Sequence, residues 1–228
     1  MPPLSSQRQT ELDYHFKEGK AWLDSSNSGK NTTALSYAAF EFRLAIERII
    51  LQYWSGLAPG GAEELSFESI RSYKSIEKRI FQIAGHQKEI NAKFEFARVL
   101  IQALKIPWEI PTPDIGKFSS YWHACSELCH IAWTLAATSQ DLVSMAYNNL
   151  LEISDFLNKH LDGVTLWAKM EEMSFRKLQD DFVAGRVSSA DVLDHLKKIG
   201  LYAVTETEGN VRKFIGEAIP PSKNDNPV

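Results

Sequence analysis

One short stretch of the sequence concentrates side chains that bind metals or transfer protons. It reads YWHACSELCHIAW and spans Tyr121–Trp133. Within it lie two of the chain's six histidines, one glutamate and both of its cysteines, namely His123, Cys125, Glu127, Cys129 and His130. These residue types can build a zinc site, a di-iron site or an acid–base pair, or they can belong to an ordinary amphipathic helix.

The geometry of a helix excludes a zinc site made from this stretch alone. Successive residues of an α-helix are about 100° apart, so the two histidines would face one side and the two cysteines the other. One helix therefore cannot surround a tetrahedral zinc ion with all four side chains. We instead expect Cys125 and Cys129 to be reduced, buried thiols, because their spacing on one helix disfavours a mutual disulfide.

A di-iron site is a minor alternative. Glu127 and His130 have the Glu-x-x-His spacing with which di-iron proteins direct ligands into a bundle core. Such a site needs a second Glu-x-x-His motif, and this sequence contains only the one. The site that we predict therefore uses no metal and no cofactor.

The remaining chemical interpretation is an acid–base face formed by His123, Glu127 and His130. A carboxylate that reaches an imidazole orients the ring and stabilises its protonated form, as general acid–base catalysis requires. We therefore predict these three residues as the catalytic set, if the chain is an enzyme. The open alternative is that they form the solvated stripe of an amphipathic helix.

The rest of the chain predicts an all-α fold that would position this face. Hydrophobic residues make up 44% of the 228 positions, and glycine and proline cluster at a few joints. We expect an up-and-down helical bundle of about five or six helices over residues 1–163. The expected helices are about Gln9–Leu23, Thr33–Trp54, Glu64–Ala84, Gln87–Lys105, Lys117–Ala137 and Ser139–Leu161. The second of them is apolar nearly all round, so we expect it at the centre of the bundle.

Residues 164–228 are predicted to form a small C-terminal appendage. A helix over about Leu166–Ala184 precedes a short capped helix, Ser188–Gly200. A β-hairpin follows across Leu201–Gly216, with its turn at Gly209–Asn210, and the last residues have the composition of a disordered tail. The short helix and hairpin resemble part of a winged helix. Their charges cancel, however, so we expect a packing or dimerisation element rather than a DNA-reading one.

Three segments resemble the HEPN superfamily of helical domains, over about Leu35–Leu161. The segment YAAFEFRLAIERIILQYW, Tyr37–Trp54, is similar to the family's early helix of small, aromatic and Arg/Glu positions. The string SELCH, Ser126–His130, is similar to strings that precede the last core helix in some members. The segment LVSMAYNNLLEISDFL, Leu142–Leu157, is similar to that aliphatic last helix. The resemblance implies a helical bundle of the kind found in prokaryotic defence and toxin systems.

Many HEPN proteins are metal-independent endoribonucleases, whose signature is an arginine a few residues before a histidine. If His130 is that histidine, the arginine should lie within residues 123–125, and none is present there. His123 could act as the second proton donor. The arginines that could supply the cation from other helices are Arg43, Arg48 and Arg98. The resemblance therefore implies a non-canonical or an inactive site, and whether the chain is an enzyme stays open.

A basic segment also favours RNA as a ligand. Residues 71–105 contain eight basic and three acidic side chains, a local net charge of +5 in a protein of net charge −4. Such a surface can lie against phosphates, although helices also carry Lys and Arg for solubility alone. The residues that we predict to bind RNA are Lys74, Lys78, Arg79 and Arg98.

The sequence lacks signals for a membrane or for export. Its first residues contain no apolar targeting segment, and charged residues interrupt the most apolar helix, so we expect a cytoplasmic protein with no membrane partner. We expect a homodimer, and a protein partner would bind through the appendage. The alternative function is a non-enzymatic helical interaction or dimerisation module, in which the bundle is a scaffold.

Overall fold

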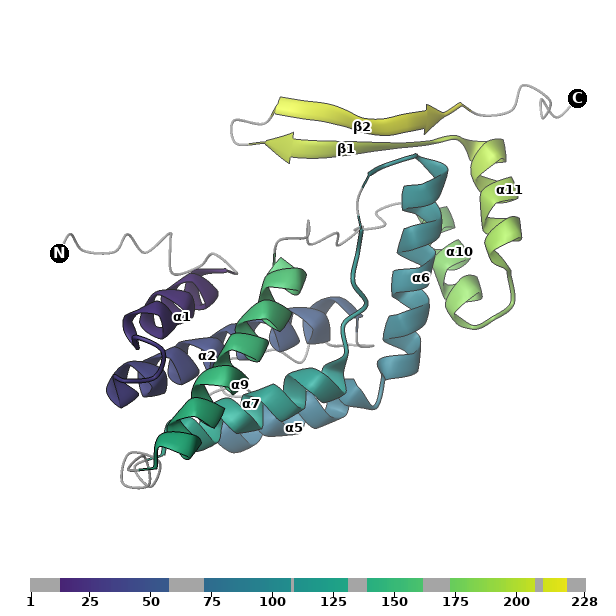
Figure 1. The fold of residues 1–228 in the computed structure, drawn as a ribbon. Helices are drawn as coiled ribbons and strands as arrows, with labels where there is room; N and C mark the ends of the chain where they lie inside the picture. Colours follow the sequence, from purple (N-terminus) through teal and green to yellow (C-terminus); the bar gives the residue numbers. More distant parts are fainter. Residues whose placement is uncertain are drawn as a thin grey trace, which may run out of the picture. The chain divides into compact units, whose positions relative to one another are not determined.

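A computed structural model shows that the protein consists of two compact units (Figure 1). The structure describes residues 13–57, 72–107, 109–130, 139–161, 173–207 and 211–220. The first unit comprises Met1–Gln87 together with Pro113–Thr165, and the second comprises Lys88–Thr112 together with Leu166–Val228. Each unit is therefore built from two separate stretches of chain.

The first unit is a bundle of α-helices. Its described helices are α1 (Tyr14–Ser25), α2 (Thr32–Leu57), α5 (Tyr73–Ala84), α7 (Ile115–Leu128) and α9 (Gln140–Leu161). The α2 helix packs against each of the other four, so it is the central helix that its apolar sequence predicted. Its fully buried side chains include Leu35, Phe42, Ile46 and Ile50. The prediction of an all-α bundle with a small C-terminal appendage is confirmed.

The α1 helix approaches α2 closely where Gly19 has no side chain. A Cβ atom at Gly19 would lie 2.5 Å from the ring of Phe42, which is fully buried. Glycine inside a helix costs about 0.5–1 kcal/mol relative to alanine. Here the close packing of the two helices offsets that cost, because any larger residue would push them apart.

The α7 helix has a fixed starting point because two side chains hold it. Asp114 is the N-cap, and its carboxylate accepts a hydrogen bond from the backbone N–H of Lys117 at 2.9 Å. The Gln87 side chain donates to the Pro113 carbonyl at 2.8 Å and accepts from the Ile115 N–H at 2.9 Å. These hydrogen bonds hold the proline-containing segment before α7 in place. They therefore fix where α7, the helix that carries His123, begins.

The second unit has a hydrophobic core of its own. Its elements are α6 (Gln87–Ala103, whose first residue belongs to the first unit), α10 (Met173–Val183), α11 (Ser189–Ile199), β1 (Leu201–Thr207) and β2 (Val211–Ile219). One cluster joins α6, α10 and α11: Phe96, Val99, Leu100, Phe175, Leu178, Val192 and Leu196. We predicted one helical bundle over residues 1–163, and residues 88–112 of that range fall in the second compact unit. Periodicity predicts that α6 has an apolar face, but it does not identify the helices that cover that face.

The second unit ends in the predicted β-hairpin. The β1 and β2 strands pair antiparallel, with Val204 opposite Phe214. Gly216 has φ +69°, and a Cβ atom there would collide with the carbonyl oxygen of Leu104, so the position favours glycine. The expected turn at Gly209–Asn210 and the expected disordered tail lie outside the described residues.

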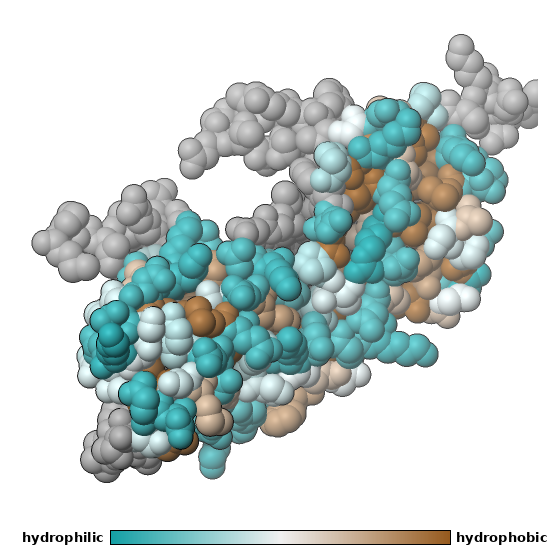
Figure 2. All heavy atoms as spheres, viewed as in Figure 1, coloured by the Kyte–Doolittle hydropathy of each residue, from teal (hydrophilic) through white to brown (hydrophobic). Residues whose placement is uncertain are grey.

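Polar residues cover much of the described surface on the face shown in Figure 2, with apolar residues exposed between them. No helix in the described ranges combines the length and the apolar character needed to span a bilayer. Among the described residues, the most exposed large apolar side chains are Met145 on α9 and Phe81 on α5, at 61% and 59% exposure. Phe81 lies among charged and polar residues of α5.

Candidate functional site

The helix that carries the candidate histidines ends earlier than its sequence predicted. We expected it to include His130, whereas α7 ends at Leu128. His130 lies in the bend that follows, is exposed, and donates its backbone N–H to the Glu127 carbonyl at 3.2 Å. It therefore does not continue the helical face that carries His123. Residues 131–138, the rest of the expected helix, lie outside the described residues.

His123 lies on α7 beside a carboxylate that comes from another helix. Its Nε2 atom is 4.0 Å from Oε1 of Glu77 on α5, and 41% of the His123 side chain is exposed. The imidazole ring lies edge-on to Trp122 at 5.0 Å, and its centroid is 6.4 Å from that of the Phe81 ring. One titratable ring therefore borders both an exposed aromatic ring and a carboxylate.

Glu127 does not contact His123 in this arrangement. The Glu127 side chain is exposed and forms no hydrogen bond or ion pair with any residue that the structure describes. The carboxylate next to His123 is instead Glu77, which we did not predict as a site residue. The available signal was the i, i+4 spacing of Glu77 and Phe81, which puts both on one side of a helix. The sequence does not indicate which neighbouring helix that side faces.

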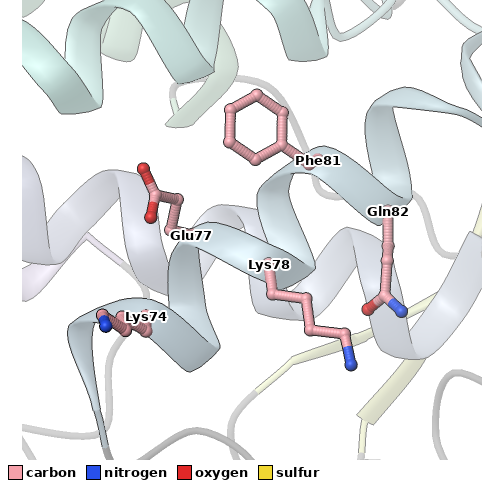
Figure 3. Close-up of a pocket in the computed structure, with 5 residues that line it drawn as sticks. All are labelled: Lys74, Glu77, Lys78, Phe81 and Gln82. Atoms are coloured by element: carbon pink, nitrogen blue, oxygen red, sulfur yellow. The ribbon is translucent and has the colours of Figure 1, made fainter.

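The α5 helix carries an open hollow formed by residues about one turn apart. This hollow, which we call the α5 hollow, has a volume of about 540 Å³. It is lined by Lys74, Glu77, Lys78, Phe81 and Gln82. Figure 3 shows the Glu77 and Phe81 side chains pointing to one side of α5 and those of Lys78 and Gln82 pointing to another. His123 borders the α5 hollow through its contacts with Glu77 and Phe81.

The four predicted RNA-binding residues lie in three different environments. Lys74 and Lys78 are exposed in the α5 hollow, and neither forms an ion pair within the described residues. Arg79 is half-buried, with its guanidinium 5.0 Å from the centre of the Trp54 ring. Arg98 belongs to the second unit and pairs with a glutamate of its own helix at 2.8 Å. Of the predicted set, the α5 hollow therefore contains the two lysines.

Contacts to three helices hold Arg43 in a defined position. The resemblance to HEPN domains had suggested this residue as one that could supply a cation from another helix. Its Nε donates to Oε1 of Glu47 at 2.9 Å, and the same oxygen accepts the indole N–H of Trp122 at 2.8 Å. The guanidinium lies 5.3 Å from the Tyr73 ring and 5.6 Å from the Trp122 ring. These contacts join α2, α5 and α7. Because Glu47 balances its charge, Arg43 is suited to packing more than to binding a phosphate.

The two cysteines are free thiols of low reactivity. Cys125 is buried as predicted, and burial raises its pKa well above the ordinary value. Cys129 is half-buried, and burial raises its pKa as well, against an opposing effect from Arg43. Both therefore remain protonated at neutral pH. Within the described ranges, no group of three or more His, Cys, Asp or Glu side chains is arranged to hold a metal ion.

Comparison with known proteins found no matching family model, no matching curated protein and no matching solved structure. The resemblance to HEPN domains therefore stays a prediction. The fold and the site define the first unit as a helical bundle in which a half-exposed histidine borders a hollow lined by lysines and an aromatic ring.

Proposed function

We propose that the first unit binds single-stranded RNA through the α5 hollow and His123. The observation that supports this most strongly is Phe81, a large apolar ring that is 59% exposed among charged residues. Proteins hold unpaired nucleotides with such surfaces, because a base stacks on the aromatic ring while a cation binds the phosphate. Lys74 and Lys78 supply two ammonium groups that form no ion pair within the described residues.

A single strand fits these features better than a duplex does. The bases of an RNA helix are paired and stacked, so an exposed ring such as Phe81 has no base face to contact. Unpaired bases present that face, and stacking one of them on an aromatic side chain contributes about 1–3 kcal/mol. We therefore propose that the ligand is an unpaired RNA loop or end rather than a base-paired stem.

We propose that the first unit binds RNA without cleaving it. Metal-free cleavage needs one group to accept the 2′-hydroxyl proton and a second to protonate the leaving oxygen of the same phosphate. His123 borders the α5 hollow, whereas His130 follows the end of α7. Glu127, the expected orienting group, contacts neither imidazole within the described residues.

Charge reversal at the two lysines should weaken RNA binding. For the variant Lys74→Glu/Lys78→Glu, we expect an affinity about tenfold lower than that of the wild type for a single-stranded RNA of mixed sequence. The slope of log affinity against log salt should also become shallower, by about 0.7 for each lost phosphate contact. Fluorescence anisotropy of a labelled oligonucleotide across a salt series measures both quantities.

The matched control reverses two exposed lysines on α1 and α9, Lys20→Glu/Lys159→Glu, with the same change in net charge. Its affinity should stay within about twofold of the wild type at moderate salt, because its lysines are outside the α5 hollow. Equal losses in both variants would mean that only the overall charge matters. A wild-type protein that retains no RNA would contradict the proposal, and RNA cut during metal-free incubation would show cleavage instead.

A further inference from the structure

We infer that Phe81, His123 and Glu77 form a pocket for one unpaired base and that the pocket selects guanine. This inference rests on the proposed RNA-binding function and names the base that the α5 hollow recognises. It follows from three observations on neighbouring side chains: the contact between the Phe81 and His123 rings, the carboxylate beside them and the lysines that line the same hollow.

The two rings lie against each other and form one aromatic surface. The centroids of Phe81 and His123 are 6.4 Å apart and the ring planes are tilted by 44°, which is an ordinary contact between aromatic side chains. The Phe81 side chain is 59% exposed, so an unpaired base can stack on its ring. His123 is held beside that ring by its edge-on contact with Trp122, which is fully buried.

Glu77 provides the hydrogen-bonding group at the edge of this space. Its Oε1 atom lies 4.0 Å from Nε2 of His123, beyond hydrogen-bond distance, and Glu77 and Phe81 point to the same side of α5 (Figure 3). No hydrogen bond to another described residue occupies the carboxylate. A base stacked on Phe81 would therefore present its Watson–Crick edge to the Glu77 carboxylate, whose two oxygens only accept hydrogen bonds.

Only guanine matches two acceptors with two adjacent donors on that edge. Its N1–H and its 2-amino group lie side by side and can both donate to one carboxylate. Adenine and cytosine offer a single amino group next to an acceptor nitrogen, and uracil offers one N–H between two carbonyl oxygens, so each would bring an acceptor against the carboxylate. Lys74 lies one turn before Lys78 and Glu77 on α5 and lines the same hollow, so its ammonium group can bind a phosphate next to the guanosine.

The test compares nine-nucleotide oligouridines that carry guanine, adenine, cytosine or uracil at the centre. The wild type should bind the guanine oligonucleotide about tenfold more tightly than the other three. Inosine at the centre, which lacks the 2-amino group, should lose most of that preference. In Glu77→Gln the preference should fall to about twofold or less, because an amide offers only one acceptor oxygen. The matched control, Glu152→Gln on α9, should keep the full preference.

The possible outcomes separate this inference from the function on which it rests. Similar affinities for all four oligonucleotides, or a guanine preference that survives Glu77→Gln, would overturn guanine selection and leave RNA binding standing. Absence of binding to every oligonucleotide would overturn RNA binding and the guanine pocket together. Circular dichroism of Glu77→Gln should match that of the wild type, since the substitution is at a partly exposed position.

Discussion

Replacing Glu47 by alanine should lower the free energy of unfolding of the first unit by about 3 kcal/mol, the largest effect that we expect from a single change. Glu47 is 7% exposed and accepts hydrogen bonds from Arg43 and from the Trp122 indole. Alanine would leave the arginine without its counter-charge and a buried N–H without an acceptor. Urea denaturation followed by circular dichroism measures the loss, since the first unit is helical.

Two comparison variants make the Glu47 prediction specific. Glu47→Gln keeps an acceptor oxygen and should lose clearly less stability than Glu47→Ala. Glu152→Ala removes a carboxylate that is 62% exposed and pairs with Lys117, and its effect should be small. If Glu47→Ala and Glu152→Ala lowered the free energy of unfolding by similar amounts, the Glu47 contacts between α2 and α7 would not stabilise the first unit as we expect.

Acidification should destabilise the first unit by about 2 kcal/mol through His160 alone, after allowance for the partial exposure of the ring. The His160 imidazole on α9 packs against the Phe118 and Phe156 rings at 5.0 and 4.7 Å, and its buried Nδ1 atom has no hydrogen-bond partner among the described residues. Burial lowers the pKa of His160 from 6.5 to about 4. Asp114 opposes this shift, and Lys159 adds to it.

The sign of this pH effect depends on whether the folded or the unfolded chain binds a proton at His160. Between pH 6.5 and about 4 the unfolded chain protonates this histidine while the folded chain does not, so stability falls as the pH falls through that range. Above pH 6.5 His160 is neutral in both states, so its full contribution to the free energy of unfolding is present. Denaturation at a series of pH values should therefore give a flatter profile for His160→Leu than for the wild type.

The matched control for this prediction is His130→Gln, because that imidazole is exposed after the end of α7. Its stability profile should run parallel to that of the wild type between pH 7 and 4. A His160→Leu profile that also runs parallel to the wild type would contradict the assignment of this acid sensitivity to the buried ring.

Local signals in the sequence predicted the features that depend on residues close together in the chain. The continuous apolar character of Thr33–Trp54 correctly indicated a central helix. Ser188 and Asp191 form the capping box that begins α11, and an antiparallel hairpin follows it. In each case the side chains that determine the structure are neighbours in sequence, so one sequence is sufficient to recognise them.

The candidate site depends on contacts between helices, which a single sequence does not reveal. Glu77 and His123 are far apart in the chain, and their proximity follows only from the packing of α5 against α7. No glycine or proline follows Leu128 to indicate that α7 ends there, so periodicity alone extended the helix through His130. The basic segment was recognisable, but which of its cations remain exposed was decided by packing, as Arg79 shows.

The most direct test of RNA binding is to find where bound RNA touches the protein. Ultraviolet crosslinking of a single-stranded RNA to the full chain, followed by mass spectrometry, identifies the residues in contact. We expect crosslinked peptides from α5 and α7, with Phe81 or His123 as the modified residue, and their loss in Lys74→Glu/Lys78→Glu. Crosslinks confined to α1, α9 or the second unit, with none on α5 and α7, would contradict the account.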